Sequence, residues 1–588
     1  MREQVMVKVA KGLAWGALAV ALAGHLWAAN RGIEMTDEAS YLLIALDPWK
    51  TLGHGTFHGF LLRPLYLLGG ETIAGIRWAG YLLVLAAAWR LAGAVRLRLG
   101  SGRDALAAFC APVLMVAAMT VYCGGIRVPC YNSMILVGTM LGWSGWLRCG
   151  LSRWAGVELG LGFAVAVVGK WTAVPFLMGL WAGLSLIEKN SEWGPSRMDW
   201  IKSLLAGAAG LAGLFLYAGL DGIHNTLQAG MIAAQTMGSH GWFIVPKYGW
   251  EIFYYLYRMG RAFVWLLPGI LLFWWLAKKN PNRWSTKKIA TILFAAGLSL
   301  AAVRGWWRGG IDQFGKESVL AGCWLLGVVW TVWAVGRRAD SGGRKTEAGG
   351  QRTEGGSRRS VVGSRWAVLT GLVFTPFLCG IGTNTSIADY AGQGTVFFAA
   401  AGVLLLGRLP ASTAATVGGV ALTGLCLLQA SRVTSSLTDI YRLGSVLRQD
   451  EVLRVGPEAG RLKVDGETRR QVESIHAILQ REGFRSGDPV VGVDSLCGWV
   501  YLAGARSPGV PWFQRDQREF LQQILARCDV QILESSWIWI RSSSGIRNPA
   551  GWWPPQAPIS HWRQAGEIPF RTDRGAEKLF LLAPKPGY

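Results

Sequence analysis

Two adjacent carboxylates, Asp37 and Glu38, are the side chains of this sequence that best suit acid–base chemistry. They lie in the stretch TDEASYLL, shortly after an apolar run from Gly12 to Ala29 that is long enough to cross a bilayer. Carboxylates are costly near hydrocarbon, so a pair at this place indicates either a function or a loop exposed to water. If the loop faces the outside above a membrane cavity, Asp37 can accept a proton from the hydroxyl group of a bound substrate.

The same pair also suits a purely structural role. Threonine is a favoured residue at the start of a helix, and carboxylates are stabilised in the first turn by the helix dipole. Thr36, Asp37 and Glu38 therefore also fit the beginning of a short helix at the membrane surface. The sequence leaves both interpretations open.

The elements that must position these carboxylates are those of a membrane protein. Of the 588 residues, 51% are hydrophobic and 16% are charged, whereas soluble domains contain about 25% charged residues. The 31 tryptophans suit the membrane–water interface. The formal net charge of +23 comes from Lys and Arg residues that gather in short segments between apolar runs. This distribution follows the positive-inside rule and argues against a nucleic acid partner.

The apolar runs and basic segments together predict about thirteen transmembrane helices within residues 1–429. The expected spans are 12–29, 72–95, 104–121, 132–147, 154–168, 171–187, 203–219, 252–276, 289–303, 318–335, 366–382, 394–407 and 411–429. Each inferred inner loop carries Lys or Arg, which places the first loop, residues 30–71, on the outer side. Residues 337–365 are rich in Gly, Ser and Arg and are predicted to form a disordered cytoplasmic loop. An odd number of spans places the C-terminus outside.

Residues 430–588 have a different pattern and are predicted to form an extracytoplasmic α/β domain. Helical patterns at 468–481 and 515–527 alternate with strand-like runs that begin at Pro489, Val530 and Lys578. Such alternation suggests a small parallel sheet, while the Trp-rich stretch 537–553 has no clear assignment.

The cysteines of the predicted outer regions have two possible states. Cys123 and Cys130 fall in one outer loop, and Cys497 and Cys528 fall in the C-terminal domain. Either pair can form a disulfide in an oxidising exterior, and free buried thiols are the alternative.

Further polar side chains gather at the predicted outer face. An enzyme that handles an anionic lipid-linked substrate needs a base for the acceptor hydroxyl and cations for the phosphate leaving group. By position, the candidate phosphate ligands are Arg63 and Arg127, and the candidate substrate ligands are His54, His58, Tyr131, Asn132 and Asn384.

Two of these outer features have alternative interpretations. His54 and His58 are four residues apart and could bind a metal ion from one helix face, but the intervening glycines weaken a helix there and favour substrate contacts. Lys170 could extend to the lipid headgroups instead of binding a substrate.

Four short motifs make the chain resemble the GT-C glycosyltransferases, in the branch of the protein O-mannosyltransferases and the lipid A aminoarabinose transferase. They are TDEASYLL after the first span, GIRVPCYNSM before the fourth, GKWTAVP between the fifth and sixth, and GTNTS after a late span. The resemblance implies transfer of a sugar from a polyprenyl-phosphate-linked donor to a glycan, lipid or protein acceptor at the outer face. It matches Asp37 to the first-loop aspartate, as catalytic base or acceptor-positioning group, with Glu38 beside it. It matches Lys170 to a polar turn near the donor phosphate.

The phosphate leaving group of such a donor is already good, so orientation and charge stabilisation are the main requirements. Direct attack by the acceptor oxygen inverts the anomeric carbon. No Asp-X-Asp motif for a nucleotide sugar and its metal stands out. Relatives with a soluble outer domain differ in metal use, so a divalent metal stays open as a cofactor.

Two other functions fit a polytopic protein of this kind: a transporter or flippase of lipid-linked sugars, and a polymerase or ligase of surface polysaccharide. Transporters commonly contain repeated halves and charges at the bilayer midplane. This sequence has no clear halves, and its polar residues fall at the outer edge. We therefore expect a transferase in the cytoplasmic membrane of a bacterium.

Overall fold

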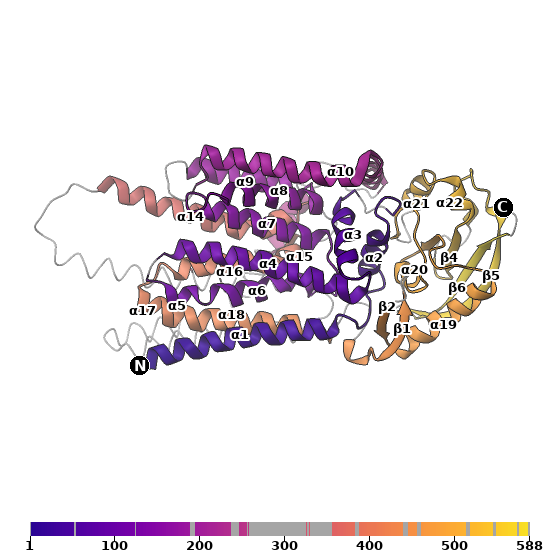
Figure 1. Cartoon of the computed structure of the whole chain (residues 1–588), viewed down its shortest axis with the longest axis horizontal. Coiled ribbons are helices and arrows are strands. Elements are labelled where there is room, and N and C mark those ends of the chain that lie inside the picture. The colour runs from indigo at the N-terminus through magenta and orange to yellow at the C-terminus, as the bar shows by residue number, and fades with distance from the viewer. Residues whose placement is uncertain are drawn as a thin grey trace, which may run out of the picture.

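The computed structural model describes the chain with gaps. The described residues are 2–51, 55–100, 102–123, 125–188, 194–236, 246–255, 257, 325, 329, 355–382, 387–438, 445–455, 460–512, 518–544, 549–572 and 575–585. The molecule is elongated, with a bundle of long helices at one end and a mixed α/β part at the other, and the C-terminus lies in the α/β part (Figure 1).

Five of the described helices are long and apolar enough to cross a membrane. They are Gln4–Ala28, Ile73–Leu99, Asp104–Tyr122, Arg197–Thr236 and Ala414–Ser435, and three shorter apolar helices are Val174–Ile187, Trp366–Cys379 and Thr395–Leu406. The prediction of a mostly helical chain with several apolar helices is confirmed. The spans predicted at 252–276, 289–303 and 318–335 lie almost entirely outside the described residues.

The helices of the first part of the bundle overlap the predicted spans, but the last of them extends well beyond the span predicted at 203–219. They are α1 (Arg2–Ala28), α4 (Ile73–Leu99), α5 (Asp104–Ala107), α6 (Cys110–Met119) with the 3-10 turn Thr120–Tyr122, α7 (Tyr131–Arg148), α8 (Ala155–Lys170), α9 (Val174–Ile187) and α10 (Arg197–Thr236). α10 is interrupted at Gly219, whose φ of 69° lies outside the helical range.

The second part of the bundle contains α14 (Gly355–Cys379), α15 (Ile387–Gln393), α16 (Thr395–Leu406), α17 (Ala411–Thr413), the π-helical turn Ala414–Gly418 and α18 (Gly419–Ser435). α14 begins at Gly355, inside the segment 337–365 that was predicted to be disordered. That part of the prediction is wrong, and residues 337–354 lie outside the described residues.

Small residues bring α7 and α8 into close contact. A Cβ atom added at Gly138 would lie 2.5 Å from the Ala166 nitrogen, and one at Gly162 would lie 2.4 Å from the Gly142 nitrogen. Close approach of this kind is typical of helices that associate within membranes. At the end of the pair, a Cβ at Gly169 would lie 2.9 Å from the Tyr131 carbonyl oxygen. The packing therefore places the start of α7 beside the end of α8.

Two short helices of the first loop, α2 (Asp37–Leu46) and α3 (His58–Leu68), lie between the bundle and the α/β part (Figure 1). Apolar residues of these helices, such as Leu42 and Leu62, share one hydrophobic cluster with Tyr501 and Trp539 of the α/β part. The first loop is thus packed on both sides.

The α/β part contains two sheets. β1 (Glu451–Val455) and β2 (Gly460–Val464) form an antiparallel hairpin. A four-stranded sheet has the order β3 (Val490–Val493), β4 (Trp537–Arg541), β6 (Gly575–Pro584) and β5 (Trp562–Thr572). Only β3 and β4 run parallel, so the sheet is mixed and not parallel as predicted. The helices are α19 (Gly466–Arg481), α20 (Cys497–Leu502), α21 (Arg518–Leu525) and α22 (Val530–Glu534), with 3-10 turns at Val446–Arg448, Pro549–Gly551 and Ile559–His561.

The strand predicted at Val530 is a helix. Asp529 caps α22, and its Oδ1 accepts a hydrogen bond from the Gln531 N–H at 2.8 Å. The strand lies instead at Trp537–Arg541, where all five residues are buried in the Trp-rich stretch. Short apolar runs fit either element, and here the acidic cap favours the helix.

The eight cysteines that the structure describes are free thiols, and seven of them are buried. Neither Cys123 with Cys130 nor Cys497 with Cys528 forms a disulfide.

Candidate active site

The start of α2 is organised by a carboxylate that precedes it. Glu34 accepts hydrogen bonds from the Thr36 N–H at 3.0 Å, from the Thr36 hydroxyl at 2.5 Å and from the Glu38 N–H at 3.1 Å. Thr36 occupies the cap position but does not cap the helix with its side chain. Glu34 therefore satisfies N–H groups that a helix start leaves without partners.

Glu38 is fully buried and its carboxylate accepts five hydrogen bonds. Arg77 donates from Nε at 3.0 Å and from Nη2 at 2.6 Å. Backbone N–H groups of Arg127, Val128 and Glu34 donate at 3.0, 3.1 and 3.0 Å. Burial by itself raises the pKa of Glu38, but Arg77 and Arg127 outweigh it and hold that pKa below the ordinary value. These contacts give Glu38 a structural role.

Arg77 and Arg127 also hold the chain at the end of α1. Arg77 donates to the carbonyl oxygens of Ala29 and Gly32, both at 2.7 Å. Arg127 donates to those of Ala28 at 2.8 Å and Arg31 at 2.6 Å. These carbonyls belong to the last residue of α1 and to three of the four residues that follow it. The guanidinium group of Arg127, a candidate phosphate ligand from sequence, is thus occupied by the backbone.

Asp37, the neighbour of Glu38, has a different environment. It is partly exposed at the first position of α2, and helical spacing puts it on the same face as Tyr41. Burial and the charge of Asp37 raise the pKa of Glu34 to about 7. Burial also raises the pKa of Tyr41 and of Cys497, and the Asp37 charge contributes in both cases. The charge of Asp37 therefore acts on Glu34, on Tyr41 and on Cys497 at the start of α20.

Five side chains, each from a different helix, form what we call the tyrosine–lysine cluster: Tyr41, His58, Tyr131, Lys170 and Tyr390. The Tyr41 ring lies 5.4 Å from that of His58 and 6.0 Å from that of Tyr131, centroid to centroid. The hydroxyls of Tyr131 and Tyr390 are hydrogen-bonded at 2.9 Å. The cluster is therefore rich in hydroxyl groups and ring faces at the end of the bundle where α2 begins.

Lys170 supplies the only cation of the cluster. Its ammonium is buried, donates to the Cys379 carbonyl oxygen at 3.0 Å and lies 4.1 Å from the centroid of the Tyr390 ring. Within the described part of the chain, no carboxylate forms an ion pair with it. Buried charges are normally paired. An ammonium that meets only a carbonyl and aromatic rings is suited to bind an anion.

The other sequence candidates are placed as follows. His58 is buried, and its Nδ1 shares a hydrogen bond with the Thr56 hydroxyl at 2.5 Å. Asn132 is buried beside Tyr131 in α7, and its Oδ1 has no hydrogen-bond partner among the described residues. Arg63 is partly buried in α3. His54 and Asn384 lie outside the described residues.

His58, Tyr131 and Lys170 thus lie in one cluster. Glu38 and Arg127 are not part of it, because their charged groups are hydrogen-bonded to Arg77 and to the backbone after α1. Tyr41 and Tyr390 were not predicted from the sequence as site residues, and neither were the contacts of Arg77 with Glu38 and the backbone. One signal for Arg77 was present, because an arginine inside an apolar run is rare and has a partner or a function. In the described ranges, no group of three or more His, Cys, Asp or Glu side chains is placed to hold a metal ion.

No family model and no curated protein matches the chain. Among solved structures, the chain is similar to two crystal structures of ArnT from Cupriavidus metallidurans, one bound to undecaprenyl phosphate and one in the apo state. The sequence identities are 12% and 13%, and the TM-scores are 0.38 and 0.39. Each alignment covers 97% of this chain and 98% of the other. The site residues are therefore assigned from the contacts within this chain.

Proposed function

We propose that the protein is a GT-C-type membrane glycosyltransferase that moves a sugar from a polyprenyl-phosphate-linked donor to an acceptor at the outer face. The observation that carries this proposal is the buried ammonium of Lys170, which has no carboxylate partner among the described residues. It lies in the tyrosine–lysine cluster next to the start of α2, where Asp37 is located.

In this mechanism Lys170 binds the donor phosphate. A phosphate that enters the cluster supplies the negative charge that the buried ammonium lacks. The hydroxyls of Tyr131 and Tyr390 can donate hydrogen bonds to its oxygens. Charge develops on the bridging oxygen as the leaving group departs, and a fixed cation in a site of low dielectric stabilises that charge.

Asp37 is the base. The acceptor hydroxyl oxygen attacks the anomeric carbon, the bond from that carbon to the phosphate oxygen breaks, and the hydroxyl proton passes to the Asp37 carboxylate. Polyprenyl phosphate leaves, and the configuration of the sugar is inverted. The contacts of Glu38 fix α2 in place, so Asp37 is held at a defined position for this step.

The proposal is tested by sugar transfer in isolated membranes with a polyprenyl-phosphate-linked donor. We expect Asp37→Asn to lower transfer by about a thousandfold or more, as loss of a base does, and Lys170→Met to abolish it. The matched controls Asp450→Asn and Lys585→Met alter exposed side chains and should transfer normally. Full activity of Asp37→Asn would remove the base from the mechanism.

A second measurement separates a transferase from a transporter. In a deletion strain, a transferase leaves its lipid-linked donor to accumulate on the outer side. A flippase leaves an intermediate on the inner side, and that result would contradict the proposal.

A further inference from the structure

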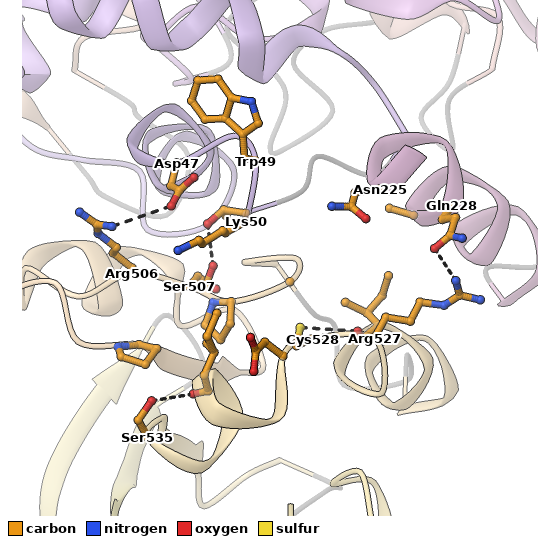
Figure 2. A pocket seen from close by; sticks show the side chains of 18 of the residues that line it. Asp47, Trp49, Lys50, Asn225, Gln228, Arg506, Ser507, Arg527, Cys528 and Ser535 are labelled. Carbon is orange, nitrogen blue, oxygen red and sulfur yellow. Dashed lines mark hydrogen bonds and ion pairs between the residues drawn. The ribbon is translucent and has the colours of Figure 1, made fainter. Parts of the chain in front are cut away.

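A second site lies away from the tyrosine–lysine cluster, where three parts of the molecule meet. A cavity of about 450 Å³ is enclosed by the segment that follows α2, by the second half of α10 and by loops and helix ends of the α/β part (Figure 2). Its volume is in the range of small-molecule sites.

The walls of this junction cavity are tied together by hydrogen bonds. The buried Thr51 hydroxyl donates to the Ser507 carbonyl oxygen at 2.6 Å, and the Gly509 N–H donates to the Lys50 carbonyl oxygen at 3.1 Å. Arg527 donates to the side chain of Gln228, which joins the segment after α21 to α10 (Figure 2). The cavity is thus a built feature of the fold and not a gap between loosely placed parts.

The lining has the chemistry of a carbohydrate site. Neighbouring hydroxyls of a sugar are bound by amides, which donate and accept hydrogen bonds, by carboxylates, which accept them, and by cations, which donate them. An indole ring adds an apolar face against which the C–H groups of a sugar can pack. The cavity offers all four kinds in Trp49, Asn225, Gln228, Asp47, Asp529, Lys50, Arg506 and Arg527.

The charges of the lining favour an anionic ligand. The lining contains three cations, Lys50, Arg506 and Arg527, and two carboxylates. Arg506 lies 3.8 Å from Asp47, and Arg527 is engaged with Gln228. Lys50 and Asn225 both line the cavity (Figure 2), and among the described residues neither side chain is hydrogen-bonded to another side chain. They are the groups that remain available for a ligand.

The position of the cavity relates it to Asp37. α2 has Asp37 at its first residue and ends at Leu46, immediately before the cavity residue Asp47. A helix of this length extends about 15 Å, a distance that a short oligosaccharide spans.

We propose that the junction cavity binds an anionic oligosaccharide, as a distal subsite for the glycan part of the acceptor. Its role as an acceptor subsite rests on the proposed transferase function, whereas the binding itself does not.

Binding is measured by titration calorimetry on the full-length protein in lipid nanodiscs. The probes are trigalacturonic acid, which is anionic, and maltotriose, which is neutral. We expect saturable binding of trigalacturonic acid and much weaker binding of maltotriose. Lys50→Ala should weaken the binding of trigalacturonic acid by about tenfold, the effect of a lost charged hydrogen bond. Asn225→Ala should weaken it less, and Lys578→Ala, a control at an exposed position of β6, should leave it unchanged.

Two outcomes would overturn the proposal: absence of saturable trigalacturonic acid binding, or binding that Lys50→Ala and Asn225→Ala leave intact. Asp37→Asn separates this proposal from the transferase function, because it should abolish transfer and preserve binding. Trigalacturonic acid binding in a protein without transferase activity would contradict only the proposed function.

Discussion

At the scale of single residues, the adjacent carboxylates Asp37 and Glu38 have opposite surroundings. Five donors surround the buried Glu38 carboxylate, whereas Asp37 is partly exposed beside the tyrosine–lysine cluster. A motif of two acidic residues thus combines one buried group that shapes the loop with one that is partly exposed at the start of α2.

Glu38→Gln should therefore destabilise the protein. Breaking a buried ion pair costs about 3–5 kcal/mol, because the partner charge, here that of Arg77, is left uncompensated. Thermal unfolding in detergent should show a lower midpoint for Glu38→Gln and an almost unchanged one for the exposed control Glu451→Gln. Equal midpoints for Glu38→Gln and the wild type would contradict the structural role.

Glu34 should make stability depend on pH. Its pKa is raised to about 7 in the folded protein, so the folded state holds a proton that the unfolded state has already released. Stability then falls as pH rises from the ordinary carboxyl pKa of about 4.3 through about 7. Unfolding midpoints of the wild type and Glu34→Gln, compared across this window, should differ in slope. Parallel curves for the two proteins would show that Glu34 does not titrate there.

At the scale of elements, α20 contacts the first loop two residues before Asp37. The Gly498 N–H donates to the Met35 carbonyl oxygen at 2.9 Å. A Cβ at Gly498 would lie 2.4 Å from the Met35 Sδ and 2.8 Å from its Cα. Only glycine fits here without moving Met35, two residues before Asp37.

Gly498→Ala should consequently lower transfer by about a hundredfold, the effect expected when a catalytic group moves by about 1 Å. Gly466→Ala is the matched control, because its Cβ would approach no atom more closely than 4.0 Å. The readout is transfer in membranes with equal amounts of folded protein. Normal transfer by Gly498→Ala would show that this contact does not position the base.

The elements also show what the sequence can predict. Apolar helices such as α1 and α4 follow from apolar runs, since the length and composition needed to cross a bilayer are properties of contiguous residues. Lys170 was recognisable as a polar residue between two such runs. Its partners Cys379 and Tyr390 were not, because they are more than 200 positions away in sequence and only packing brings them near. The helix at Val530 was mistaken for a strand because an apolar run of this length fits both.

At the scale of the whole molecule, the first loop and the α/β part share one hydrophobic cluster. Leu42 in α2 is fully buried there. The packing of the α/β part should therefore depend on residues of the first loop.

Leu42→Ala should lower stability by about 2–5 kcal/mol and increase protease cleavage within the α/β part. Leu68→Ala, at an 83% exposed position, is the control. Fragments identified by mass spectrometry provide the readout. Unchanged cleavage of the α/β part in Leu42→Ala would show that the two regions are stabilised independently.

The hydrogen bonds that hold the chain after α1 have a consequence for the folding of the newly made protein. The carbonyls of this segment accept hydrogen bonds from Arg77 and Arg127, which come later in the chain. Residues 30–32 also exchange hydrogen bonds with Lys463 in β2, at 2.7 and 2.8 Å. The ribosome must therefore synthesise the chain as far as Lys463 before residues 30–32 can form all of these hydrogen bonds. We therefore expect the first loop to reach its final arrangement only in the completed molecule, because a shorter chain lacks the contact with Lys463.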